Sequence, residues 1–585
     1  MGEQKPVRVH WELETTAGRQ ATWDLFSDTD RFNRAAGLGY RYVDTPQPDG
    51  TLRRVGTITR LGITVSWDEL PFHYAKPDWF RSVREFHAGP GLKLVTTVRF
   101  RDLAGGGTGI RYTVEVTPRS VLYRPVVALE LNTGTRKTLD RTFEAVLKLL
   151  EGSPATYDPT PAPLPVQAGA EVARVCGALD PPELGQHLHE LLARGALREQ
   201  ERIRPLGLAR EWGLPPNVVI EGCLHAAREG VLMVRWDVMC PSCRGPQESL
   251  PALTFRGKRI HCYACNIGFD GSFADALEVS FRPAPQIRTI DLPVACAGSP
   301  GRQRHVVAQS VVPPEGRTLL ELDLEPGPYR LATLAVSRVD GRSEERKELN
   351  PVLIDVEAEG PESQALIHAD GFGLMPARLL LRSGPVSLSV ASESLAALGL
   401  KLELRWQPGD ILTAGALLEH PGALDLIPSD TLDPAFSAEV QRLGVIAVAS
   451  ARDHQRTLDA AHIAVAGRPK QSVQRGDRKL VATFSDAGEL VDVARQIARS
   501  EHAQVAVGWG SVVVVRDGDK TATWGTAVRH AQAVLPAATP RTIVMNQSAA
   551  SAEPLRKALE QRELLLVKVP GRLPGGRPVY LFKGS

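Results

Sequence analysis

The amino-acid sequence predicts a multidomain α+β protein. Its 585 residues are too many for one hydrophobic core, because single cores stop growing at roughly 250–300 residues. Stretches with helical periodicity and stretches with strand-like alternation follow one another without an internal repeat. The 44 prolines and 52 glycines favour many turns and linkers. Roughly three to five domains are therefore expected.

The composition is that of a globular protein with almost balanced charge. The 69 lysines and arginines and the 67 aspartates and glutamates leave a formal charge of +2, which argues against a protein dominated by contacts to a nucleic-acid backbone. The first residues lack the apolar run of a signal peptide. The most apolar stretch, at 505–515, is too short to span a bilayer and predicts two paired buried strands with a turn at residues 508–510. We therefore expect a cytoplasmic protein without a membrane span.

Residues 7–152 are predicted to form the first domain. They begin with the alternating strand VRVHWELE and the helical stretch ATWDLFSDTDRFNRAAG, and after several strands they close with the amphipathic helix NTGTRKTLDRTFEAVLKLLEG. Leu139, Phe143, Val146 and Leu150 form one stripe of that helix. This order resembles the START-like (SRPBCC) helix-grip family.

The resemblance implies a sheet wrapped around the last helix, often with an apolar cavity between them. Such a domain would bind an apolar small molecule or a protein partner. The aromatic residues that fit equally well as cavity lining or as ordinary core are Trp11, Trp23, Phe26, Trp67, Phe72 and Trp79.

The middle of the chain alternates between linkers and small modules. Residues 153–170 are rich in proline and predict an extended linker. Residues 171–236 show the order helix, turn, helix and strand, which suits a small winged-helix-like segment. Residues 286–408 change to strands and turns and predict a β-sandwich-like segment. Residues 409–437 are less regular and are expected to form a second linker.

Two CxxC pairs lie within residues 237–285. Cys240 and Cys243 in CPSC are separated by 18 residues from Cys262 and Cys265 in CYAC. Each pair presents two thiolates to one metal, so these four cysteines are the predicted ligands of a structural zinc ion in a zinc ribbon. The basic residues around the pairs are Arg244, Arg256, Lys258, Arg259 and His261. This cluster is too small to indicate nucleic-acid binding, so the metal is interpreted as a clip for a segment with little core of its own.

Residues 438–585 are predicted to form a final α/β domain of alternating strands and helices. The segments TWGTAV, TIVMNQS and VYLF are similar to segments of the class III adenylate/guanylate cyclase catalytic domain, which has a ferredoxin-like α/β fold. Further upstream, SDTDRFNRAAGL, RWDVMCPSCR, HVVAQ and PGPYRL resemble a bacterial architecture that precedes some of these domains. In that architecture a START-like domain, a zinc ribbon and a β-rich segment come before the catalytic part.

The cyclase resemblance implies two aspartates that hold two magnesium ions. Aligned without gaps, Ser450 stands at the first of these positions, and a neutral hydroxyl is a poor magnesium ligand. Arg478 falls on the second position, although a slip of one residue would restore Asp477 there. Magnesium is therefore expected only if the site is active.

The other functional positions of the family are also replaced. The adenine-reading Lys and Asp fall on Gln474 and Ala522, and the Asn and Arg that stabilise the transition state fall on Arg529 and Ala533. Loss of charge-stabilising groups of this kind costs about a hundredfold or more in rate for each group. We therefore assign no catalytic or nucleotide-binding residue and predict a degenerate cyclase domain.

Three functions are compatible with the sequence. The first is an adenylate cyclase-related signalling or scaffold protein with an inactive cyclase-like domain, which would form a homodimer or bind a partner protein. The second is an active class III adenylate cyclase, for which Asp453 and Asp477 are the nearby carboxylates. The third is a nucleic-acid-binding regulator that uses the winged-helix-like and zinc-ribbon segments. The sequence favours them in this order.

Overall fold

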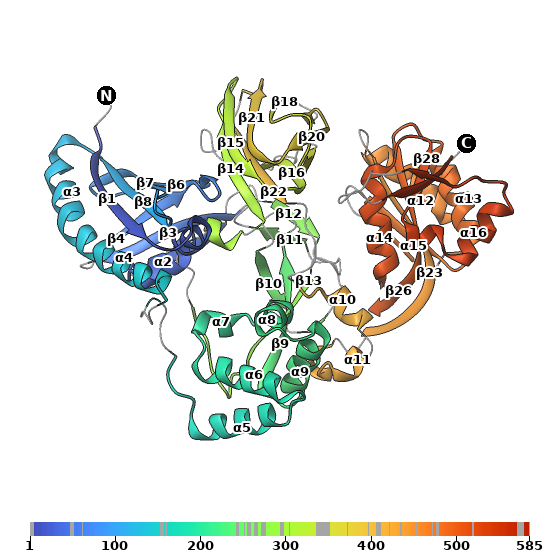
Figure 1. The fold of residues 1–585 in the computed structure, drawn as a ribbon, viewed down its shortest axis with the longest axis horizontal. Coiled ribbons are helices and arrows are strands. Elements are labelled where there is room, and N and C mark those ends of the chain that lie inside the picture. The colour runs from blue at the N-terminus through green and yellow to red at the C-terminus, as the bar shows by residue number, and fades with distance from the viewer. Residues whose placement is uncertain are drawn as a thin grey trace.

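We analysed a computed structural model of the chain. The residues that it describes are 5–46, 52–60, 63–152, 157, 161–240, 245–250, 252–253, 259–262, 267–270, 277–292, 296, 298–303, 305–334, 351–370, 373–395, 397–404, 411–420, 422–432, 436–450, 454–470, 472–475, 479–517, 520–569 and 578–583. They form a multidomain α+β assembly (Figure 1). Among them, no helix is long and apolar enough to cross a membrane.

The N-terminal domain is an antiparallel sheet with a long helix at its C-terminal end. Its strands are β1 (Val7–Thr15), β2 (Arg41–Pro46), β3 (Leu52–Arg60), β4 (Ile63–Glu69), β5 (His73–Ala75), β6 (Trp79–Phe86), β7 (Gly91–Asp102) and β8 (Thr108–Pro118). Its helices are α1 (Arg19–Phe26), α2 (Thr29–Ala35), the 3-10 turn η1 (Val121–Tyr123), α3 (Arg124–Glu130), the π-helical turn η2 (Leu131–Thr135) and α4 (Arg136–Leu150). The strands pair in the order β1-β8-β7-β6-β4-β3-β2, with β5 also paired to β6.

Burial in this domain follows the predicted periodicities. Val9 and Trp11 alternate inward along β1. Leu139, Phe143 and Val146 of α4 are buried at helical spacing. Strand, two helices, curved sheet and long final helix are the helix-grip order that the sequence predicts for residues 7–152.

The central region combines helices with a short three-stranded sheet. Its helices are α5 (Val166–Gly177), α6 (Pro182–Arg194), α7 (Leu197–Glu201), α8 (Pro205–Trp212) and α9 (Pro216–Arg228). Its strands β9 (Leu232–Met239), β10 (Pro246–Leu250) and β13 (Leu277–Pro283) pair in the order β10-β9-β13, and β11 (Arg259–Cys262) pairs with β12 (Ile267–Asp270). The helices and one face of the sheet share an apolar core with Trp236 completely buried in it.

Residues 306–404 form two sheets around one apolar core. One sheet contains β14 (Val306–Val312), β22 (Leu398–Leu404), β16 (Gly327–Leu334), β17 (Val352–Glu357) and β20 (Arg378–Arg382). The other contains β15 (Arg317–Leu324), β21 (Gly384–Ser392), β18 (Gln364–Ala369) and β19 (Leu374–Met375). Strand β14 also pairs with β5, at Ala308 with Ala75 and Gln309 with Tyr74. The N-terminal sheet therefore continues into the sandwich.

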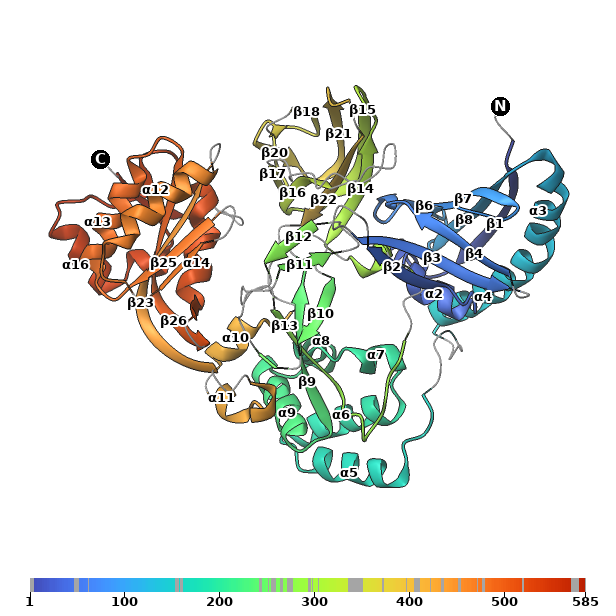
Figure 2. The same ribbon diagram turned by 180° about the vertical axis from the view of Figure 1, so that it is seen from behind.

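The C-terminal domain is a sheet with helices on both faces (Figures 1 and 2). Its strands are β23 (Phe436–Ser450), β24 (Ser472–Arg475), β25 (Lys479–Phe484), β26 (Ala503–Asp517), β27 (Lys520–Trp524), β28 (Thr542–Met545), β29 (Val567–Val569) and β30 (Val579–Lys583). Its helices are α12 (His454–Ala466), α13 (Ala487–Ala498), α14 (Thr526–Val534), α15 (Gln547–Ala550) and α16 (Glu553–Glu560). Two short helices precede it, α10 (Ala414–Glu419) and α11 (Ala423–Leu426).

One prediction for this domain is wrong. Residues 503–517 form the single strand β26, not a pair of strands, and it is paired with β23 from Phe436 opposite Asp517 to Ser450 opposite Ala503. The sequence pattern suggested that the glycines form a turn, whereas in the structure Gly508 allows a close contact with a helix. A Cβ at Gly508 would lie 2.5 Å from the carbonyl oxygen of Ala527, so this glycine lets α14 approach the sheet closely.

Candidate functional site

Aromatic rings fill the region between α4 and the sheet of the N-terminal domain. The ring centroid of Phe143 lies 5.6 Å from that of Trp11 and 5.0 Å from that of Tyr112. Phe26 and Phe32 complete the contacts at 6.1 and 5.9 Å. These separations are those of packed aromatic pairs. The sequence left open whether the aromatic residues of this domain line a cavity over the last helix or form an ordinary core. The ring contacts favour an ordinary core.

A charged residue lies in a second aromatic cluster of the same domain. The guanidinium of Arg84 lies 4.5 Å from the ring centroid of Tyr40 and 5.3 Å from that of Trp67. Its Nε donates to Glu69 Oε1 at 3.2 Å, and the hydroxyl of Tyr42 donates to Glu69 Oε2 at 2.5 Å. Burial, and then the charge of Glu69, raise the pKa of Tyr42 well above its ordinary value. The contacts of the cation with its carboxylate partner and with the rings join β4, β6 and the start of β2.

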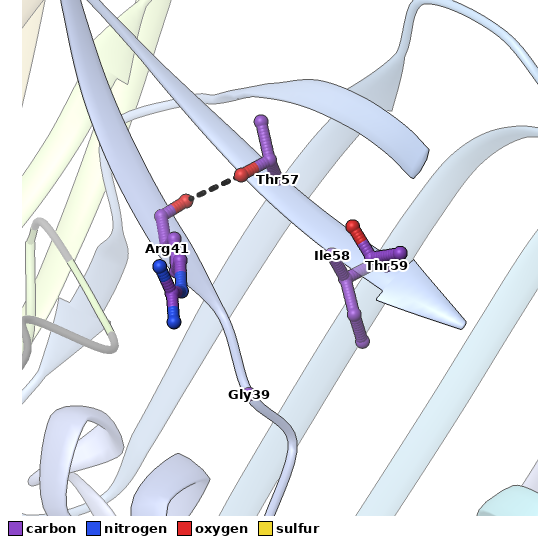
Figure 3. A pocket seen from close by; sticks show the side chains of 5 residues that line it. All are labelled: Gly39, Arg41, Thr57, Ile58 and Thr59. Carbon is purple, nitrogen blue, oxygen red and sulfur yellow. Dashed lines mark hydrogen bonds between the residues drawn. The ribbon is translucent and has the colours of Figure 1, made fainter. Parts of the chain in front are cut away.

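A hollow of ≈ 360 Å³ lies beside this cluster, and its lining residues are Gly39, Arg41, Thr57, Ile58 and Thr59 (Figure 3). Arg41 is opposite Thr57 in the β2–β3 pair, so both point to one face of the sheet. Gly56 of β3 is opposite Tyr42 of β2 and, across the next strand pair, opposite Trp67 of β4. Alternation places these residues on the opposite face. Ile58 alternates to the face of Gly56, so the hollow has lining residues from both faces at this edge of the sheet.

A segment from the centre of the chain closes on α1 and α2. The buried amide of Cys296 donates to Asp30 Oδ1 at 3.0 Å, and the hydroxyl of Thr29 donates to Cys296 Sγ at 3.0 Å. The amide of Gly301 donates to the carbonyl oxygen of Ser27 at 3.0 Å. Burial raises the pKa of the Cys296 thiol well above its ordinary value, so this cysteine packs as a neutral side chain.

The same contact contains two buried aspartates with distant arginines. Asp28 pairs with Arg198 of α7, and Asp30 pairs with the neighbouring Arg34 at 2.8 Å and also accepts from the distant Arg302 at 3.4 Å. These aspartates belong to SDTD, part of a segment that carries the bacterial resemblance. The sequence singled out the segment that contains the two aspartates. It did not predict Arg198 and Arg302 as their partners, because these arginines lie about 170 and 272 residues away.

The predicted zinc ligands are only partly within the described residues. Cys240 is buried, and its amide donates to the carbonyl oxygen of Gly245 at 3.0 Å. Cys262 ends β11 opposite Ile267 of β12. In both pairs the first cysteine is therefore joined by backbone pairing to the residue five positions later. Cys243 and Cys265 lie outside the described residues, so zinc binding stays a prediction.

The residues at the cyclase metal positions are partly described. Ser450 ends β23, is buried, and accepts a hydrogen bond from the hydroxyl of Thr457 at 3.1 Å. Its hydroxyl therefore faces α12. Asp453, Asp477 and Arg478 lie outside the described residues.

Two of the four remaining positions, Ala522 and Ala533, have no polar side-chain group. Gln474 is in β24 opposite Val481, whereas Ala522 is in β27 opposite Val515. Ala533 is in α14. Arg529, also in α14, is the charged one, and its Nη2 lies 2.5 Å from Glu419 Oε2.

Glu419 belongs to α10, and its carboxylate lies at the start of α14. The hydroxyl of Thr526 donates to Glu419 Oε2 at 3.1 Å. A Cβ on Gly525, whose φ is +120°, would lie 2.7 Å from Glu419 Oε1, so a glycine is needed for this approach. The carboxylate thus has Arg529 on one side and the positive end of the helix dipole on the other.

Apolar residues extend the same contact. Leu417 and Leu418 of α10 are buried in the core cluster that also contains Val513, Val515 and Trp524 of β26 and β27. The described residues therefore join the C-terminal domain to the central region by apolar packing and by the Glu419–Arg529 ion pair. The sequence predicted residues 409–437 as a linker, and it offered no pattern that paired Glu419 with Arg529.

A buried charge network on the central sheet was also not predicted. Asp237 lies 3.0 Å from Arg202 and 3.2 Å from Arg235, and Glu278 is held by Arg204. Both carboxylates are fully buried. Burial lowers the pKa of Arg202. Removing one member of such a network leaves an uncompensated charge, so we interpret it as structural.

Comparison with known proteins assigns no family to the whole chain. Residues 172–296 match a family of unknown function (DUF5939), and no curated protein matched the chain. This match runs from α5 to Cys296 and includes the helices, the central sheet and both CxxC pairs.

Several solved structures are similar to part of the chain. A START superfamily protein from Mycobacterium smegmatis is 15% identical, with 24% of this chain and 98% of that chain covered and a TM-score of 0.19. The Zhui aromatase/cyclase from Streptomyces sp. R1128 is 13% identical, with 25% and 94% covered and a TM-score of 0.20. A truncated norcoclaurine synthase from Thalictrum flavum is 13% identical, with 26% and 96% covered and a TM-score of 0.19. The helix-grip assignment itself rests on the strand order and helices described above.

Proposed function

We propose that this chain is a non-catalytic signalling or scaffold protein, with a cyclase-related C-terminal domain that is docked on the central region. The observation that carries the proposal is the Glu419–Arg529 ion pair. Arg529 stands where the cyclase resemblance places a transition-state group, and its Nη2 donates to an internal carboxylate, that of Glu419. Leu417 and Leu418 bury apolar surface beside it.

The state of Ser450 supports the same proposal. At the position of the first metal aspartate the chain has a neutral hydroxyl, buried and hydrogen-bonded to Thr457. A hydroxyl without a neighbouring carboxylate is a weak ligand for magnesium. The function of the C-terminal domain would then be to bind, either to the central region or to a partner that displaces it.

For the N-terminal domain we propose that it acts through its surface rather than by enclosing an apolar small molecule. Packed rings occupy the space next to Phe143, and residues 296–301 already close on α1 and α2. A zinc ion at the two CxxC pairs would stiffen the segment between the helices and the sandwich.

The test is production of cyclic AMP and cyclic GMP from ATP and GTP by the purified full chain with manganese, which is the permissive metal. We expect no product. Product that is lost in Asp453→Ala or Asp477→Ala would overturn the proposal and establish the alternative, an active class III cyclase with an atypical site.

Docking has its own test, independent of catalysis. Glu419→Ala removes the carboxylate partner of Arg529 and is expected to raise hydrogen exchange in α14 of the full chain. Glu501→Ala is the matched control, since it removes an exposed carboxylate 3.1 Å from Arg541 in the same domain. Equal exchange in α14 for the two variants would mean that the ion pair does not hold the domains together.

A further inference from the structure

The N-terminal domain carries an exposed apolar ridge on η1 and α3. Its members are Val121, Leu122, Tyr123, Val126 and Leu129, with exposed fractions of 69%, 87%, 44%, 54% and 66%. In the described part of the chain sixteen large hydrophobic side chains are exposed, and these five fall within nine consecutive residues. Single exposed apolar residues are ordinary, but a cluster of this kind marks an interaction surface. We call it the α3 ridge.

The ridge lies on the solvent side of a helix that is already packed. Val127 and Leu131 of the same helical run are buried against the domain core. Leu122, Val126 and Leu129 are spaced by four and three residues, so they share one face, opposite to Val127. A helix that is apolar on two opposite faces has a second surface to cover.

The rest of the described chain does not cover it. Helix α3 lies at the outer edge of the molecule in both views, on the side of the N-terminal domain that faces away from the central and C-terminal domains (Figures 1 and 2). The ridge is therefore available to a partner outside this chain.

Exposed cationic residues lie toward both ends of the ridge. Residues 119–137 contain four arginines and lysines and one glutamate, a formal charge of +3, whereas the whole chain carries +2. Arg124 is exposed, and it donates to the carbonyl oxygen of Lys5 at 2.6 Å, which brings a further lysine to this end of the helix. Arg136 and Lys137 lie at the other end. Apolar side chains between cationic ends are complementary to an anionic lipid surface.

We propose that the α3 ridge docks this protein on an anionic membrane surface, with the ridge side chains inserted among the lipid head groups and the cationic ends against the lipid phosphates and carboxylates. A second copy of the chain fits less well, because a two-fold contact would place the +3 segment against itself. A lipid surface also accepts a protruding helix without a matching groove, whereas a protein partner has to supply one. This inference goes beyond the proposed function, since it gives the protein a location at which to act.

The test is co-sedimentation of the full chain with vesicles of phosphatidylcholine alone and of phosphatidylcholine with phosphatidylserine. We expect binding to the anionic vesicles only, weakened by salt. Leu122→Ser with Leu129→Ser is expected to lower the partition coefficient at least about tenfold, because each leucine contributes apolar surface to the inserted face. The matched control is Leu395→Ser with Ile463→Ser, which changes side chains that are 82% and 73% exposed elsewhere and should leave binding unchanged.

A second variant keeps the test decisive if the leucine variant does not fold. Arg124→Glu with Lys137→Glu reverses the charge at the two ends and should abolish the preference for anionic vesicles. Failure to bind either vesicle, or equal binding by the wild type and the ridge variants, would overturn the proposal. So would light scattering that shows a dimer of the wild type and a monomer of the leucine variant, because the ridge would then be covered by a second copy.

Discussion

Truncation of Phe143 tests whether the interior of the N-terminal domain is a packed core or a ligand site. Phe143 is 2% exposed and contacts the rings of Trp11, Phe26, Phe32 and Tyr112 at centroid distances of 5.0–6.1 Å. Phe143→Ala removes the ring but leaves its neighbours held by the sheet and by α1 and α2. It should therefore open a cavity that the surroundings only partly fill.

The size of the effect follows from these contacts. Truncation of a buried phenylalanine costs about 3–5 kcal/mol, and each aromatic pair adds about 0.5–1.5 kcal/mol beyond the buried area. With four ring contacts at Phe143, we expect a loss near the upper end, about 5 kcal/mol. An apolar cavity of this origin stays dry and binds small apolar molecules. The variant should therefore gain binding of an apolar dye that the wild type lacks.

Hydrogen exchange on the full chain measures this loss domain by domain, which suits a protein whose domains do not unfold as one unit. The free energy of opening in β1, β8 and α4 should fall, and that in α13 and α16 should not. Glu144→Ala, which removes an exposed neighbour on the same helix, is the control and should change little. A loss below about 1 kcal/mol for Phe143→Ala, or dye binding by the wild type, would refute the packed core and favour a ligand cavity.

Three further changes have defined outcomes. Gly56→Ala places a Cβ 2.3 Å from Cε2 of Trp67, which is 1% exposed. It should destabilise the N-terminal domain by about 1–3 kcal/mol, measured by the same hydrogen exchange. No change would mean that Trp67 or the strand can move to make room for the methyl group. Burial opposes ionisation of Glu403, but Lys401 and Arg330 together favour the carboxylate, so the pKa of Glu403 is lowered. The sandwich should therefore lose stability as the pH falls below the ordinary value of 4.5. Acid titrations followed by circular dichroism measure this loss, and Glu403→Gln should remove the contribution of this residue. The purified chain should contain one zinc ion per molecule by elemental analysis, and Cys240→Ser should lose it; a metal-free wild type would exclude the zinc prediction.

The periodicity of apolar residues predicted correctly those helices and strands whose conformation depends on neighbouring residues in the sequence. The α4 stripe of Leu139, Phe143 and Val146 is buried as predicted, since helical spacing places these residues on one face whatever they pack against. The strand VRVHWELE is confirmed as β1, since alternation places every second residue of a strand on the same face. The multidomain α+β class is confirmed as well.

Local pattern was insufficient where a distant element decides the conformation. The glycines of residues 508–510 suggested a turn, but β23 pairs along the whole of β26 and α14 lies close above Gly508. In a sequence, a glycine that forms a turn looks the same as a glycine that lets another element pack closely against the backbone. Only the position of that other element, here α14, distinguishes the two.

The sequence by itself determined the element types, the helix-grip order of residues 7–152 and the absence of charged groups at the described cyclase positions Ser450, Gln474, Ala522 and Ala533. Tertiary structure decided what those elements contact. It brought Glu419 to Arg529, β14 to β5 and Cys296 to Asp30, and it left the α3 ridge facing solvent. The physical reason is that periodicity records which face of an element is apolar, whereas the identity of the partner depends on chain segments tens to hundreds of residues away.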